Sequence, residues 1–120
     1  MELMVKDIGV LAAGADLSSK QFYFVQISAE DTCNLAGAAD ESTIGILQNE
    51  PESGQAASIR TMGISMLVLG DTVSVDDQLT PDADGKGVPA TTGEKYLCRA
   101  LQAGSAGESI SVLMEINRVA

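Results

Sequence analysis

The feature that most constrains this chain is its central part, residues 43–69, where short apolar runs alternate with turn signals. The first run is β-branched and aliphatic and has the length of a strand. Pro51 has no N–H for a strand ladder and Gly54 permits a positive φ, so this pair marks a turn. Residues 56–62 then alternate, and Gly63 interrupts them before a last apolar run. We expect three short strands here, and these segments carry no nucleophile, base or ligand cluster.

The same order of strand, turn and strand recurs later in the chain. Three pairs of residues align without a gap at an offset of 53 residues: Ile44 with Leu97, Gly54 with Gly107, and Ile59 with Val112. Two copies at this spacing are too few and too long for a solenoid. The pattern predicts a pseudo-symmetric β domain with two related hairpins.

The remaining segments also favour strands. Residues 21–28 have the most regular alternation in the chain and place Phe22 and Phe24 on one face. These two aromatic side chains serve either core packing or an interface between chains. No convincing 3.6-residue period extends beyond about two helical turns. We therefore expect an all-β protein, with one compact domain of short strands over residues 18–120 that resembles a barrel or sandwich.

The N-terminal segment, residues 1–17, has a weaker pattern, in which Leu3, Val5 and Ile8 roughly alternate. It is either an extended arm or the first strand of the domain. We assign it to an N-terminal arm. Leu3, Val5 and Ile8 are then candidate contacts with a partner, whose sheet edge the arm would extend by strand addition.

The charge balance argues against several classes of partner. The chain has 17 Asp and Glu residues, only 7 Lys and Arg residues and no His, which gives a net charge of −10. This composition disfavours binding to nucleic acid or to an anionic membrane surface. No secretory signal opens the chain and no apolar run reaches transmembrane length, so we expect synthesis in the cytoplasm. Cys33 and Cys98 lack the spacing of a metal site and are expected to be reduced.

No constellation of residues predicts catalysis. Residues 82–87 resemble the start of a calcium loop, but the acidic residue of position twelve is replaced by Gly93, which favours a plain Asp-Gly turn. The neighbouring carboxylates also fall in expected turns: Asp76, Asp77, Glu50 and Glu52. Serine side chains have no His to activate them. We expect no catalytic residue, metal, cofactor or small-molecule substrate.

One short motif offers an alternative. Residues 12–18 read Ala-Ala-Gly-Ala-Asp-Leu-Ser and look like the Ala-Gly-x-Asp-Leu signature of trimeric dUTPases, which are also small all-β proteins. That family's uracil-pocket, Gly-Arg-Ser-Ser and C-terminal phosphate-loop motifs are missing from the sequence. A degenerate dUTPase-like hydrolase is therefore one alternative function, and a small β-barrel adaptor or ligand-binding module is another.

The order of motifs over residues 12–112 resembles a different family, the small capsid decoration (cement) proteins of tailed bacteriophages. The matching segments are Ala15-Asp16-Leu17-Ser18, Gln21-Phe22-Tyr23-Phe24-Val25, Ile44-Gly45-Ile46-Leu47-Gln48-Asn49, Pro51, Gly54-Gln55-Ala56-Ala57, Gly63-Ile64-Ser65, Gly70-Asp71, Asp84-Gly85-Lys86, and residues 100–108. Cys98 and Arg99 depart from the family pattern, which usually has Gly and an aliphatic residue there.

The resemblance implies a structural protein and no enzyme. Such proteins bind the outside of the expanded head as homotrimers and clamp the major capsid protein against the pressure of packaged DNA, so the implied location is the virion surface. Closed symmetry and effective concentration let small contacts hold such a trimer in place. In this interpretation Phe22 and Phe24 lie at the trimer interface, and Leu3, Val5 and Ile8 contact the capsid.

Overall fold

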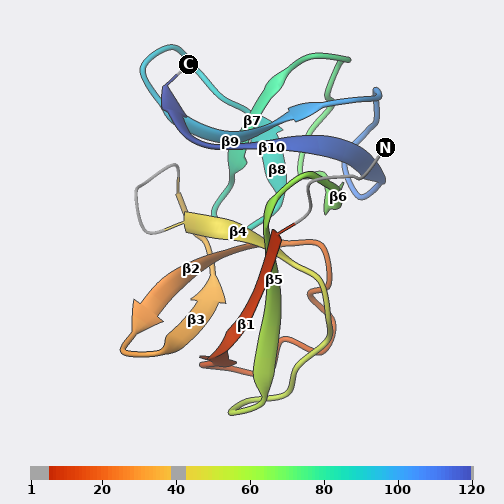
Figure 1. Ribbon diagram of the computed structural model, residues 1–120. Coiled ribbons are helices and arrows are strands. Elements are labelled where there is room, and N and C mark those ends of the chain that lie inside the picture. The colour runs from red at the N-terminus through yellow and green to blue at the C-terminus, as the bar shows by residue number, and fades with distance from the viewer. Residues whose placement is uncertain (1–5, 39–42, 120) are drawn as a thin grey trace, which may run out of the picture.

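The computed structural model describes residues 6–38 and 43–119, and this part of the chain forms ten strands and no helix (Figure 1). The strands are β1 (Lys6–Ala13), β2 (Phe24–Ala29), β3 (Thr32–Leu35), β4 (Thr43–Leu47), β5 (Ala56–Met62), β6 (Ile64–Val68), β7 (Gln78–Pro81), β8 (Gly87–Pro89), β9 (Lys95–Ala100) and β10 (Ser109–Val119). The predicted all-β fold is confirmed.

The strands form two sheets that follow each other along the chain. The first five close into a barrel in the order β1-β3-β2-β4-β5, and the last five form a sheet in the order β6-β10-β9-β7-β8. Figure 1 shows the barrel below and the second sheet above. We call residues 6–62 the first unit and residues 64–119 the second unit. Gly63, with a φ of 96°, joins them in a conformation that favours glycine.

The two units have the same topology. In the first unit β1 pairs antiparallel with β5 and parallel with β3. In the second unit β6 pairs antiparallel with β10, and Leu69, directly after β6, forms a parallel bridge to Gly87 in β8. The strand pairs of the two units also have matching registers. In the first unit Leu47 pairs with Ile59, Val25 with Leu35 and Ala12 with Ala56. The corresponding pairs of the second unit are Ala100 with Val112, Leu79 with Pro89 and Val68 with Ser109. The predicted repeat is therefore confirmed, and it extends from one hairpin to the whole five-stranded unit.

One type of turn occurs four times and leads into a strand each time. Its first N–H donates to the side chain of its fourth residue, at 2.6–2.9 Å, and the fourth N–H donates to the first carbonyl. Its third residue has a positive φ: Gly54, Asp76, Gly93 and Gly107. The fourth residues are Gln55, Asp77, Glu94 and Glu108. Three of the acidic residues of this chain thus serve turn geometry.

The segment expected to be an arm belongs to the barrel from residue 6 onward. β1 pairs with β5, and the N–H of Leu17, whose side chain is buried, donates to the carbonyl of Pro51. The interpretation as an arm is therefore wrong for residues 6–17, and the alternative of a first strand is right. A closed barrel has no unpaired strand edge, and β1 closes this one because it pairs with both β5 and β3. Leu3 and Val5 lie outside the described residues.

Removing residues 1–13 tests this assignment. We expect the truncated protein to lose cooperative unfolding in urea, because without β1 the barrel is open and the buried side chains of Ala57 and Ile59 face water. Circular dichroism and urea titration measure the effect. A truncation of residues 1–5, which leaves β1 intact, is the control. A cooperative transition with an unchanged midpoint after removal of residues 1–13 would contradict the assignment.

The turn at residues 91–94 predicts a specific pH dependence. Hydrogen bonds from the backbone and the side chain of Thr91 hold the pKa of Glu94 below its ordinary value. A lowered folded pKa contributes stability above the unfolded pKa of about 4.3, and this stability is lost as the pH falls through the folded pKa. We expect Glu94→Gln to flatten this acid-side loss in the free energy of unfolding. Glu50→Gln, which removes an exposed carboxylate outside these turns, should leave it unchanged.

Candidate interaction surface

The two units share one core. Phe24 and Ile46 of the first unit are fully buried, and they pack with buried side chains of the second unit in a single cluster. The members from the second unit are Leu67, Leu69, Val73, Leu79, Leu97, Cys98, Ala100, Ile110, Val112 and Met114. One face of the first barrel is therefore covered by the second unit, and burial of apolar surface holds the units together.

Backbone hydrogen bonds insert residues 22–24 into the second unit. The N–H of Val68 donates to the carbonyl of Phe22 at 2.9 Å, and the N–H of Phe24 donates to the carbonyl of Gly85 at 2.8 Å. In the first unit the equivalent groups bond to each other directly, from the N–H of Ala12 to the carbonyl of Asp31 at 2.9 Å. The first unit thus supplies a segment that the second unit needs to complete its own sheet.

Phe22 and Phe24 do not lie on one face of a strand. Phe22 has a φ of 70°, so β2 begins only at Phe24, two residues after it. Phe24 is 0% exposed and has no surface to offer another chain, which makes its assignment to a trimer interface wrong and core packing right. Phe22 is partly buried against the same core. Ile8 is half-buried against the core inside the barrel.

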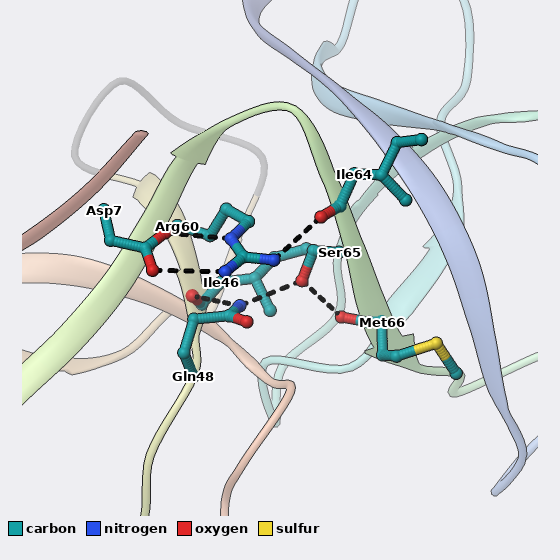
Figure 2. A network of polar contacts seen from close by, with 7 residues as sticks. All are labelled: Asp7, Ile46, Gln48, Arg60, Ile64, Ser65 and Met66. Carbon is teal, nitrogen blue, oxygen red and sulfur yellow. Dashed lines mark hydrogen bonds and ion pairs between the residues drawn. The ribbon is translucent and has the colours of Figure 1, made fainter. Parts of the chain in front are cut away.

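A polar network lies at the joint between the units (Figure 2). The guanidinium of Arg60 donates to Asp7 at 2.8 and 3.2 Å and to the carbonyl of Ile64 at 2.9 Å. These bonds to Asp7 raise the pKa of Arg60. Nearby, the side-chain amide of Gln48 donates to the hydroxyl of Ser65 at 2.9 Å. That hydroxyl in turn donates to the backbone carbonyl of Met66, also at 2.9 Å. Side chains thus cover the carbonyls along β6, as an edge strand requires.

The outer face of the second unit is the equivalent of the covered face of the first unit. Register places Leu113 opposite both Ile64 and Arg99, and places Arg99 opposite Gln78. Arg99 takes the position that buried Ile46 has in the first unit, and it forms ion pairs with Asp76 and Glu115. Two apolar residues, Leu113 and Ile64, follow Arg99 in register across the sheet, and two more, Val75 and Leu101, adjoin Asp76 and Ala100 in the sequence. We call these residues and Arg99 the outer face.

Two of these apolar residues adjoin a pair of backbone hydrogen bonds between residues 76–77 and 100. The N–H of Asp76 donates to the carbonyl of Ala100, and the N–H of Ala100 donates to the carbonyl of Asp77. Val75 and Leu101 flank this pair and are 62% and 44% exposed. Their equivalents in the first unit, Gln21 and Gln48, are polar, and the side-chain amide of Gln21 donates to the backbone carbonyl of Gln48 at 2.9 Å. Sequence patterns missed the outer face, because only the superposition of the two units reveals it.

The other candidates from the sequence have structural roles. The carboxylate of Asp82 accepts from the N–H groups of Asp84 and Lys86, which confirms the Asp-Gly turn. Cys33 and Cys98 are free and buried, and burial raises the pKa of both thiols. Within the described part of the chain there is no cluster of metal-ligating side chains, no pocket, and no helix long and apolar enough to span a membrane.

Comparison with known proteins gives a structural relative. No protein-family model matches the chain, and no curated protein does. Among solved structures, the fold is similar to the crystal structure of the head fiber gp8.5 N base in bacteriophage phi29, with a TM-score of 0.70. The alignment covers 98% of this chain and 99% of that chain at 13% sequence identity. The two proteins therefore share a fold over their whole matched length.

The shared core predicts the effect of a substitution in the joint. We expect Phe24→Ala to destabilise the protein by about 3–5 kcal/mol, because the substitution leaves a cavity between the units. This cavity cannot collapse unless both units move. Ile27→Ala, three residues further on at a 52% exposed position, should change stability by no more than about 0.5 kcal/mol. Urea unfolding measures both. Equal effects would contradict the role of Phe24 in the joint.

Proposed function

We propose that this protein is a structural component of a bacteriophage head. It binds the outer surface of the expanded capsid as a homotrimer and stabilises the shell as a decoration protein. The observation that carries the proposal is the fold similarity to a phage head fiber base, which covers nearly the whole of both chains. Such a protein needs complementary surfaces and symmetry, and it needs no catalytic group.

The sequence supports the same proposal independently. The order of motifs over residues 12–112 resembles the capsid decoration family, and this resemblance extends over most of the chain, whereas the dUTPase-like signature covers only residues 12–18. The acidic composition suits a protein exposed on a particle, because net charge of one sign limits association between particles. The major capsid protein is the partner in this proposal, and the virion surface is the location.

The residues of the dUTPase-like motif have structural roles in this fold. Ala13 and Leu17 are buried in the barrel core, each with 2% exposure. Asp16 accepts a hydrogen bond from the N–H of Ser18, and bonds from Ser18 lower the pKa of Asp16. The same residue types therefore serve the turn that follows β1. Nothing in the described residues specifically favours an adaptor or a ligand-binding module, so we do not carry that alternative further.

The proposal is tested by binding to heads. Purified protein is mixed with expanded heads of the phage that encodes it, produced without the protein, and with unexpanded heads as the control. We expect saturable co-sedimentation with expanded heads only, together with a higher temperature of DNA release. Absence of binding to expanded heads, or equal binding to both forms, would overturn the role in decoration.

A further inference from the structure

Two backbone groups of the first unit reach out of the barrel and hold the second unit. The carbonyl of Phe22 accepts from the N–H of Val68 at 2.9 Å, and the N–H of Phe24 donates to the carbonyl of Gly85 at 2.8 Å. These two bonds are the backbone part of the joint. The corresponding groups of the second unit are therefore candidates for a contact of the same kind.

The corresponding segment is residues 76–78, at the start of β7. The φ of Asp76 is 73° and that of Phe22 is 70°. The N–H of Asp76 donates to the last carbonyl of β9, and the N–H of Phe22 donates to the last carbonyl of β4, both at 2.8 Å. The carbonyl of Gln78 accepts from the residue after β8, and the carbonyl of Phe24 accepts from the residue after β3. The carbonyl of Asp76 and the N–H of Gln78 thus match the two groups that hold the joint.

These two groups form a short open edge on the second unit. A strand residue directs its N–H and its carbonyl to the same side, so the N–H of Gln78 faces the side of β8. The pairing of β7 with β8 covers only residues 79–81. None of the described residues supplies an acceptor for the N–H of Gln78 or a donor for the carbonyl of Asp76. Open edges of this kind are templates for pairing with another chain.

Asp76 itself is strained at this edge. In the other three turns of the same type the residue with a positive φ is a glycine. A side chain at such a φ costs free energy, and residues of this kind cluster at functional sites. The side chain of Asp76 is 76% exposed and contacts one nitrogen of Arg99 at 3.1 Å. Its carboxylate can therefore also receive a cation from a partner.

A second copy of this chain has no surface that fits the open edge. The joint is filled by β6 and the turn at Gly85, whose equivalents in the first unit are β1 and the turn at Asp31. These two segments are bonded to each other through the N–H of Ala12, and the barrel is closed. The occupant is therefore a different protein. Gly85 lies so close that a Cβ atom there would be 3.0 Å from the carbonyl of Phe24, so glycine fits best at the matching position of the occupant.

We propose that the open edge at residues 76–78 binds an extended segment of the major capsid protein by strand addition. The segment donates an N–H to the carbonyl of Asp76 and accepts the N–H of Gln78. It carries a glycine beside Gln78 and a basic side chain that meets the carboxylate of Asp76. The inference names a contact surface for the proposed function and rests on that function.

Removal of one donor tests the contact. Gln78→Pro deletes the N–H at the first residue of β7, a strand position that tolerates proline, so we expect an unchanged urea midpoint. Binding to expanded heads should weaken by about tenfold or more, because one hydrogen bond is lost and the ring obstructs the edge. Ala106→Pro, at the exposed second residue of another turn, is the control and should bind as the wild type does. Equal binding by Gln78→Pro would overturn the contact alone, whereas a wild type that binds no heads would overturn both the contact and the proposed function.

Hydrogen exchange tests the same edge without a substitution. In the isolated protein we expect the N–H of Gln78 to exchange fast and that of Phe24 to exchange slowly, since only the latter is hydrogen-bonded. On expanded heads the peptide that contains Gln78 should become protected. Protection already present in the isolated protein would assign the edge to a contact between copies and overturn the proposal. A Gln78 amide that stays unprotected on heads would overturn it as well.

Discussion

The structure depends on the insertion of residues 22–24 between β6 and the turn at Gly85. Without this segment the second sheet lacks a partner for the N–H of Val68, and the shared core lacks Phe24. Unpaired backbone groups and exposed apolar surface are both costly, so the second unit depends on the first for its stability. In this arrangement Phe22 has a positive φ, which is a strained backbone conformation for a residue other than glycine. Packing against the core holds that residue in place.

Much of the architecture is one five-stranded arrangement that occurs twice. Two five-stranded units with the same strand order and register follow each other in one chain. Equivalent positions differ where their surroundings differ: Ile46 is fully buried, whereas Arg99 is half-buried and paired with Asp76 and Glu115. Comparison of the two units thus separates residues that maintain the fold from residues adapted to a joint or to a surface. The similarity to a phage head fiber base covers both units together.

The turns show why composition alone was ambiguous. Asp77, Glu94 and Glu108 accept hydrogen bonds from the backbone three residues earlier. A composition-based interpretation treats these carboxylates as solvated charge for solubility, and the structure adds a geometric role for each. The repeated signature of a residue with positive φ followed by Glu, Gln or Asp was present in the sequence, but it is too short to stand out from ordinary loops.

The sequence by itself determined the all-β class, the strand and turn positions of the central hairpin, and the repeat of that hairpin. These depend on local alternation, on Pro51 and on glycines such as Gly54, whose effects act within a few residues. The tertiary structure alone decided that β1 closes the barrel and that Phe24 is buried between the units. The physical reason is that strand edges and apolar faces find their partners across long sequence separations. Local propensity carries no information about which distant edge or face a given strand will meet.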